Sequence, residues 1–300
     1  MNENKDDKID TSTDDTNHAI ANCVVIGAMK SGTTALARRF DEHPEIYVAP
    51  IKETHFFAED ELYAGGISEY AKYFSTYTNE SAIVDLSPSY SRSKRYPDAA
   101  KRLAKAIPNA KIIYILRDPI ARMESHWIEA RRGGWPVPPF NEAVFSDTDI
   151  LSSSCYWSEL NMYREHYSDD NILVLFTEEL HKNPEDLLRR CYEFLQVDSN
   201  FKNPGLGQIE RQSEGAYIDK DWTARYLRTG LGKMVGKLMP RKIINILRPL
   251  VRSKVEARPV WKQETLKHSL EIIRPDAEKI LAYAGKPLDY WKLDDERTIN

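Results

Sequence analysis

The amino-acid sequence predicts an α/β fold, a three-layer sandwich in which a central parallel β-sheet is flanked by helices, with a helical extension toward the C-terminus. Short apolar runs alternate with longer segments of helical spacing along the first 200 residues. The links between these runs are long enough to hold the crossover helices that parallel strands require. A chain of 300 residues with 41% hydrophobic content can also bury a substantial core.

The first strand and helix enclose a loop of small residues. Residues 23–26 are apolar and β-branched, as in a buried strand, and residues 35–40 have helical spacing. The loop between them reads Gly27-Ala-Met-Lys-Ser-Gly-Thr-Thr34. Unpartnered N–H groups and a positive dipole at a helix N-terminus favour phosphate oxygens. This segment is therefore predicted to bind phosphate.

The loop spacing matches the P-loop pattern G-x-x-x-x-G-K-[ST] except for the position of its lysine. Thr33 stands at the usual lysine position, and the lysine comes earlier, at Lys30. A lysine earlier in the loop suits a 5′ group shorter than a triphosphate, such as a phosphosulfate. The alternative is an ordinary strand-to-helix turn, because short motifs also arise by chance.

A second strand, loop and helix follow at residues 111–127. Asp118 suits the N-cap and Pro119 the first helical position, which places Arg117 at the carboxyl end of the strand. Open parallel sheets bind ligands at that edge. Arg117 would bind a phosphate through charge-assisted hydrogen bonds and Ser125 would add a hydroxyl donor. The alternatives are a salt bridge for Arg117 and a solvated helix position for Ser125.

Together these two segments resemble the sulfotransferases that use 3′-phosphoadenosine 5′-phosphosulfate, over roughly residues 22–200. The resemblance implies that Arg117 and Ser125 hold the 3′-phosphate of this donor, and that its product is adenosine 3′,5′-bisphosphate. No metal is expected, because the leaving nucleotide carries one phosphate at the reacting end. The residues that the resemblance assigns to the 5′-phosphosulfate are Lys30, Ser31, Gly32, Thr33 and Thr34.

The segment Lys52-Glu-Thr-His-Phe-Phe57 resembles a marker of the glycan-modifying branch, which includes heparan sulfate sulfotransferases and bacterial relatives. This implies that Glu53 is the catalytic base. Sulfuryl transfer itself calls for a base at the acceptor and a cation at the leaving nucleotide, the latter being Lys30. His55 is the rival base and a candidate acceptor contact. If residues 53–57 are extended, Glu53 and His55 share one side.

A third strand, near residues 82–85, leads into Asp85 and the turn at Ser87 and Pro88. We expect Asp85 either to bind the acceptor or to hold Lys30, with capping of that turn as an equal alternative. Heparan sulfate enzymes have a lysine where Leu86 stands here, which argues against a heparan-like substrate.

The remaining elements complete the predicted α/β order. Helices are predicted at 96–107, 155–167, 184–195 and 264–284, with a strand at 171–176 and a packing tail at 286–291. Arg211 and Ser213 lie where relatives place a loop over the nucleotide, and they are further candidate donor contacts.

Residues 225–254 contain many lysines and arginines and no acidic residue, although the net charge of the chain is −4. Interleaved apolar residues predict basic amphipathic helices on either side of Pro240. An anionic glycan or an anionic membrane surface is a candidate partner, and a solvated helix face is the alternative.

We expect a polar, disordered tail at 1–20 and one domain at 21–300, with its core at about 22–200, the basic extension at 220–260 and a packing helix at 262–291. No run approaches the roughly 18 apolar residues of a membrane span and no signal peptide is evident, so a cytoplasmic enzyme is expected. Three scattered cysteines favour neither disulfides nor zinc.

The predicted function is sulfuryl transfer to a hydroxyl or amine of a small acceptor, with a saccharide expected and no nucleic-acid partner. One alternative is a P-loop kinase, which would require a lysine at position 33 and an aspartate that binds Mg²⁺. Asp85 is a candidate for that aspartate. Another is a catalytically inactive nucleotide-binding adaptor at a membrane surface. The sequence indicates no oligomeric state.

Overall fold

The structure is a computed structural model that describes residues 19–51, 53–133, 135, 137–146, 149–204, 206, 217–219, 252–254 and 259–294. These residues form two compact units. The first contains the described residues of Met1–Ala28, Gly32–Leu116 and Glu159–Leu206. The second contains those of Met29–Ser31, Arg117–Ser158 and Gly207–Asn300. Almost all of the predicted tail at 1–20 lies outside the described residues.

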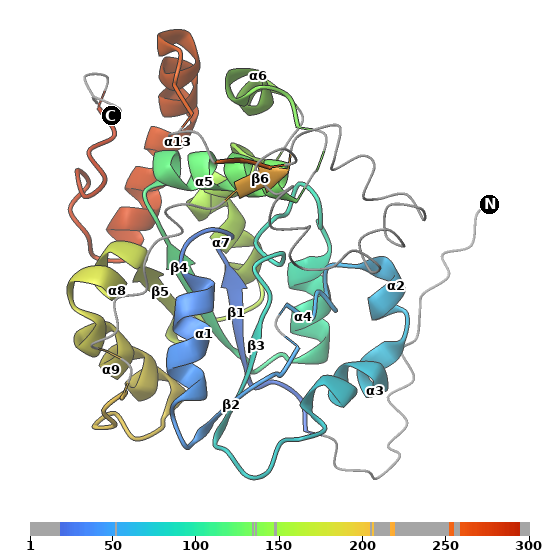
Figure 1. The fold of residues 1–300 in the computed structure, drawn as a ribbon. Coiled ribbons are helices and arrows are strands. Elements are labelled where there is room, and N and C mark those ends of the chain that lie inside the picture. Colours follow the sequence, from blue (N-terminus) through green and yellow to red (C-terminus); the bar gives the residue numbers. More distant parts are fainter. Residues whose placement is uncertain are drawn as a thin grey trace, which may run out of the picture. The chain divides into compact units, whose positions relative to one another are not determined.

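The first unit is built on a five-stranded parallel sheet, which confirms the predicted fold class. Its strand order is β2-β3-β1-β4-β5, and Figure 1 shows β1 between β3 and β4. Strand order reverses at β1, and open α/β sheets bind ligands beyond the carboxyl ends of strands at such a reversal. The strands are β1 (Cys23–Gly27), β2 (Ile46–Val48), β3 (Ala82–Leu86), β4 (Lys111–Leu116) and β5 (Ile172–Phe176).

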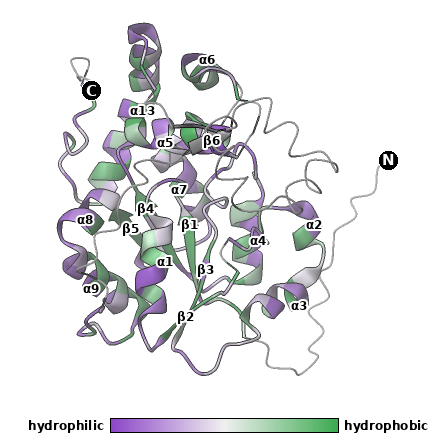
Figure 2. Ribbon diagram, in the orientation of Figure 1, coloured by the Kyte–Doolittle hydropathy of each residue, from purple (hydrophilic) through white to green (hydrophobic). Residues whose placement is uncertain are grey.

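One face of the sheet packs against α1 (Thr33–Asp41), α8 (Thr177–Lys182) and α9 (Pro184–Leu195). Alternate strand residues such as Val25 and Val84 join Leu36 and Phe40 of α1 in this core. Figure 2 shows the strands as the hydrophobic centre of the ribbon. The other elements of the unit are α2 (Asp60–Tyr63), α3 (Gly66–Ala71), η1 (Lys72–Phe74), α4 (Ala99–Ala106) and η3 (Asp169–Asn171).

The second unit contains α5 (Pro119–Arg132), α6 (Phe140–Phe145), η2 (Ser152–Ser154) and the start of α7 (Tyr156–Arg164). It also contains α13 (Gln263–Tyr283) and an antiparallel strand pair, β6 (Tyr217–Asp219) with β7 (Arg252–Lys254). The Asp276 carboxylate of α13 accepts hydrogen bonds from the backbone N–H groups of Trp157 and Ser158, at 2.8 and 2.9 Å. These are orphan donors at the first turn of α7, so α13 caps that helix.

Most element predictions are confirmed, with shifts at the ends. The predicted helices at 96–107 and 155–167 occupy Ala99–Ala106 and Tyr156–Arg164, because turns fill the remaining positions. Basic amphipathic helices were predicted within 225–254 on either side of Pro240, and the last three residues of this range instead form strand β7, which pairs with β6. Residues 225–251 lie outside the described part of the chain. In the described ranges no helix combines the length and apolar character needed to cross a membrane.

Candidate active site

Two glycines shape the loop that follows β1. Gly27 has φ +153°, and a Cβ placed on it would lie 2.0 Å from Ser91 Oγ, so no side chain fits there. Gly32 has φ +90° and forms the N-cap of α1, with its carbonyl accepting the Leu36 N–H at 3.0 Å. Thr33 and Thr34 form the first turn of α1. Their N–H groups are among those that have no partner within the helix, which suits an anionic group.

Lys30 lies at the middle of this loop, in the second unit, with a left-handed backbone at φ +70°. Its Nζ forms an ion pair with Glu129 Oε2 of α5, at 3.2 Å. Its carbonyl accepts a hydrogen bond from Arg117 Nη1, at 3.4 Å. The two residues that the sequence assigns to opposite ends of the nucleotide are therefore in contact within one unit, through the side chain of Arg117 and the backbone of Lys30.

The prediction that Asp118 caps α5 is confirmed. Its side chain accepts the Ala121 N–H at 2.9 Å, and Pro119 is the first helical residue. Arg117 thus directly follows β4, and its carbonyl accepts a hydrogen bond from Tyr156 Oη at 2.8 Å. This second contact fixes the backbone from which the Arg117 side chain projects.

Ser125 is half-buried on α5, one turn before Glu129. Residues four apart occupy the same face of a helix. Because Glu129 reaches Lys30, Ser125 belongs to the face of α5 that is directed toward the loop. Lys30 and Arg117 are in contact, and the donor-binding roles of Lys30, Arg117 and Ser125 stay predictions. Arg211 and Ser213 lie outside the described residues.

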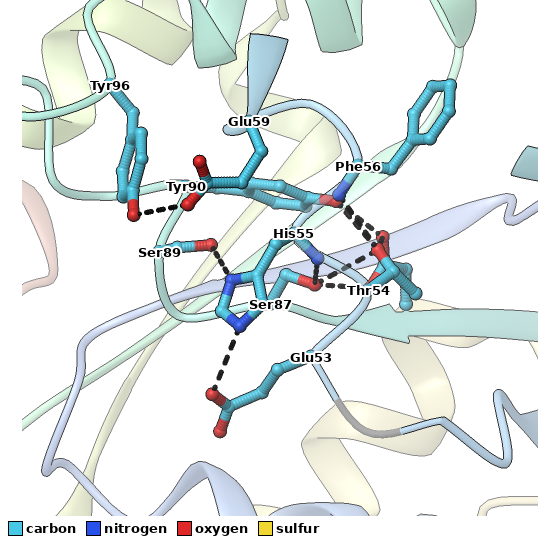
Figure 3. A network of polar contacts seen from close by, with 10 residues as sticks. Glu53, Thr54, His55, Phe56, Glu59, Ser87, Ser89, Tyr90 and Tyr96 are labelled. Carbon is cyan, nitrogen blue, oxygen red and sulfur yellow. Dashed lines mark hydrogen bonds and ion pairs between the residues drawn. The ribbon is translucent and has the colours of Figure 1, made fainter. Parts of the chain in front are cut away.

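Glu53 and His55 come together in the first unit, but not for the predicted reason. The premise of an extended segment is wrong, because both residues have left-handed backbones, with φ of +65° and +54°. His55 Nε2 nevertheless lies 3.8 Å from Glu53 Oε2, and His55 Nδ1 lies 2.8 Å from Ser89 Oγ. Figure 3 shows the imidazole between these two partners. Both side chains are partly accessible, at 35% exposed for Glu53 and 39% for His55.

The Asp85 side chain is fully buried at the end of β3. Oδ1 accepts a hydrogen bond from Ser87 Oγ at 2.7 Å. Oδ2 accepts hydrogen bonds from Tyr90, Thr54 and Tyr70 at 2.9, 3.0 and 3.1 Å. Burial raises the pKa of Asp85, although these hydroxyl donors act in the opposite direction. Of the three roles expected of Asp85, its contact with Ser87 fits the one in the turn at Ser87 and Pro88, and the roles toward the acceptor and Lys30 stay predictions.

Sequence reasoning missed several residues that contact the predicted ones. Glu129 carries a usable signal, since it stands four residues after Ser125 on a predicted helix. Ser89 and Tyr90 follow Asp85 closely, but nothing in their pattern distinguishes them from an ordinary turn. Tyr70 reaches Asp85 from α3, a contact that depends on the tertiary fold. Among the residues that the structure describes, no three His, Cys, Asp or Glu side chains are grouped as metal ligands.

Comparison with solved structures supports the fold. A crystal structure of a sulfotransferase from Alicyclobacillus acidocaldarius superposes with a TM-score of 0.64, covering 91% of this chain and 99% of that one. Sequence identity is 21%, so this likeness concerns the fold alone.

Curated relatives carry sulfotransferase names. A membrane-associated sulfotransferase, kil1, of Dictyostelium discoideum is 34% identical over 143 residues, covering 45% of this chain and 29% of that protein. The mouse bifunctional heparan sulfate N-deacetylase/N-sulfotransferase 4 is 26% identical over 291 residues, covering 89% of this chain and 30% of the relative. The chain thus spans less than a third of the length of these two proteins.

A protein-family model described as the sulfotransferase domain matches residues 21–230. This range is more than half of the 300-residue chain, and it includes the loop at Gly27, the Glu53 segment and Arg117. The chain belongs to the sulfotransferase domain family.

Proposed function

We propose that this protein transfers the sulfuryl group of 3′-phosphoadenosine 5′-phosphosulfate to a hydroxyl or amine of an acceptor. The observation that carries the proposal is the hydrogen bond from the Arg117 side chain to the carbonyl of Lys30, a residue of the loop bounded by two glycines with positive φ. Glycines give a nucleotide access to backbone N–H groups, and two neighbouring cations suit a ligand with separate anionic groups. The family assignment agrees with this chemistry.

In this proposal Lys30, Ser31, Gly32, Thr33 and Thr34 bind the 5′-phosphosulfate, while Arg117 and Ser125 bind the 3′-phosphate. When bound, the donor supplies a sulfur atom joined to a phosphate oxygen that can leave. The acceptor oxygen or nitrogen forms the new bond to sulfur as the old bond from sulfur to phosphate oxygen breaks. Lys30 compensates the negative charge that grows on the leaving nucleotide.

The acceptor must lose a proton as it attacks, and we assign that proton to Glu53. His55 has Ser89 at Nδ1 and Glu53 at Nε2, so its ring nitrogens both face polar partners. This arrangement favours His55 as the residue that orients the Glu53 carboxylate. Active sites commonly pair a base with a second residue that orients it, because a general base works best when a neighbouring group fixes its direction.

The acceptor we propose is a saccharide, since relatives are named for heparan sulfate. Leu86 occupies the position of the lysine expected in heparan sulfate enzymes, so a less anionic saccharide is favoured. The kinase alternative gains nothing from Asp85, whose two oxygens already accept four hydroxyl hydrogen bonds. Contact of residues 225–254 with a membrane stays a prediction.

The direct test is incubation with donor labelled with radioactive sulfur and a panel of saccharides, followed by identification of the labelled product. We expect label to pass to one class of saccharide with the wild-type protein and not with Glu53→Gln. The same panel with ATP labelled at its γ-phosphate should give no labelled product. Phosphoryl transfer in place of sulfuryl transfer would overturn the proposal.

A further inference from the structure

We propose that Asp85 is a positioning residue that acts through Thr54 to hold Glu53 and His55 in their working geometry. The inference rests on the proposed function, because it takes Glu53 as the base. It gives Asp85 a role inside the fold, distinct from contact with the acceptor.

Asp85 is a carboxylate with no exposed surface, surrounded by hydroxyl groups. Four hydroxyls donate to it, at 2.7 to 3.1 Å, and three of them converge on Oδ2. Burying a charge is costly unless hydrogen bonds replace its water. A buried carboxylate with this many donors forms strong contacts, since hydrogen bonds to a charged acceptor are roughly twice as strong as neutral ones.

One of those donors is Thr54, which stands between Glu53 and His55 in the sequence. Its side chain is buried, while the side chains of Glu53 and His55 are partly accessible. Thr54 Oγ1 also lies 3.0 Å from Tyr90 Oη and 3.3 Å from Ser87 Oγ. Figure 3 shows Thr54 among these hydroxyls while His55 is directed at Glu53 and Ser89. The anchor and the reactive side chains therefore belong to one short segment.

The backbone around Thr54 is tied to the same hydroxyls. The His55 N–H donates to Ser87 Oγ at 3.3 Å, and the Phe57 N–H donates to Tyr90 Oη at 3.4 Å. Asp85 orients both hydroxyls, because each donates its own hydrogen to the carboxylate. The carboxylate thus orients the Thr54 hydroxyl and two further hydroxyls, those of Ser87 and Tyr90, that contact residues 54–57.

Glu53 and His55 need such support because their conformations are unfavourable. Left-handed backbones are rare for residues with a side chain, and they persist where the surroundings determine them. If Thr54 were released, residues 53–55 would relax toward ordinary conformations. The Glu53 carboxylate and the His55 ring would then separate. The loss would appear in the catalytic step more than in binding of the nucleotide.

The test compares Asp85→Asn, Thr54→Val and Thr54→Ser with a matched control, Glu159→Gln. Glu159 is also a buried carboxylate of the first unit, and its oxygens accept from the N–H and Oγ of Ser93, both at 2.9 Å. Replacing it removes a buried charge without touching residues 53–57. Thr54→Val removes the anchoring hydroxyl at nearly constant shape, and Thr54→Ser keeps it.

We expect kcat to fall about tenfold or more in Asp85→Asn and Thr54→Val, with the KM for the donor within about twofold of wild type. Thr54→Ser should recover most of the rate. The double variant Asp85→Asn/Thr54→Val should be no slower than Asp85→Asn alone, since the hydrogen bond that Thr54→Val removes is one of those that Asp85→Asn already alters. Wild-type kcat in Asp85→Asn, or an equal fall in Glu159→Gln, would overturn the inference.

Amide hydrogen exchange over residues 53–57 provides a readout independent of activity. It should be faster in Asp85→Asn and Thr54→Val than in wild type or Glu159→Gln. If amide exchange over residues 53–57 were unchanged in Asp85→Asn and Thr54→Val, the inference that Asp85 holds this segment would be overturned even if kcat fell. Wild-type turnover in Glu53→Gln would instead refute the proposed base, while the exchange data would still decide whether Asp85 holds the segment.

Discussion

Lys30 and Glu129 form an ion pair in which Nζ lies 3.2 Å from Oε2. The pair joins Lys30 to α5 within the second unit. In the proposed function the donor brings anionic oxygens to Lys30, and these must compete with the Glu129 carboxylate. We therefore expect Glu129 to weaken nucleotide binding while it holds the Lys30 side chain in one position.

Glu129→Gln should bind adenosine 3′,5′-bisphosphate about two- to fivefold more tightly than wild type, because exposed ion pairs contribute roughly 0.2–1 kcal/mol. Isothermal titration calorimetry measures the change, and added salt should shrink it. Glu142→Gln is the control, since it removes an exposed charge on α6 of the same unit. Weaker binding in Glu129→Gln would mean that Glu129 positions Lys30 for the ligand.

Lys30→Ala should lose both nucleotide affinity, by about tenfold or more, and kcat, by about 10²–10³-fold. The lysine is expected to contact the donor in the ground state and to stabilise the leaving nucleotide. Lys101→Ala on α4 provides a matched loss of an exposed lysine. Unchanged nucleotide affinity in Lys30→Ala would remove Lys30 from the donor site.

Glu53→Gln should lower kcat by about 10²–10⁴-fold and leave nucleotide affinity unchanged, as removal of a general base does. His55→Asn should have a smaller effect if His55 orients Glu53. Single-turnover rates measure the effect on the chemical step, and binding of the bisphosphate nucleotide measures the effect on affinity. The reverse order of severity would assign the base to His55.

The stability of Asp85→Asn relative to wild type should depend on pH. Burial raises the pKa of Asp85 above its ordinary value of 3.8, so the folded protein holds this proton more tightly than the unfolded chain. The contribution of Asp85 to the free energy of unfolding is therefore fully present below the ordinary value and is lost as pH rises through the raised value. Tyr70 and Tyr90 beside it have raised pKa values and stay neutral throughout.

Urea unfolding of both proteins at about pH 4 and about pH 7 tests this sign. The difference in free energy of unfolding between wild type and Asp85→Asn should be smaller at the higher pH. Asparagine does not titrate, and the contributions of all other titrating groups cancel in this difference. A wild-type advantage that grows with pH would show that the hydroxyl donors outweigh burial.

Local sequence signals predicted the strands of the sheet and the start of α5 well. The strand at Lys111–Leu116 and the cap at Asp118 were predicted correctly because apolar runs and capping residues act through their immediate neighbours. The backbone at Glu53 and His55 was predicted wrongly, and its neighbours are distant in sequence: the Asp85 carboxylate of β3 contacts Thr54, and the Ser89 hydroxyl of the following loop contacts His55. No local pattern carries that information.

The position of Asp85 shows the same limit. Its place at the end of a strand was predicted, but its surroundings were not, because Tyr70 approaches from α3 across the tertiary fold. Glu129 was likewise on a predicted helix, yet its partner Lys30 lies 99 residues earlier. Pairs this distant in sequence are established only by packing.

The cap that Asp276 places on α7 connects the C-terminal helix α13 to Arg117, one of the proposed donor-binding residues. Asp276 holds the first turn of α7, and Tyr156 at that turn supports the Arg117 carbonyl. A fragment ending before Gln263 would keep every proposed donor-binding residue. It would lose α13, and with it the Asp276 carboxylate that holds the first turn of α7 next to Arg117. Deletion mapping of such a fragment would therefore report weak nucleotide binding without removing a single ligand contact.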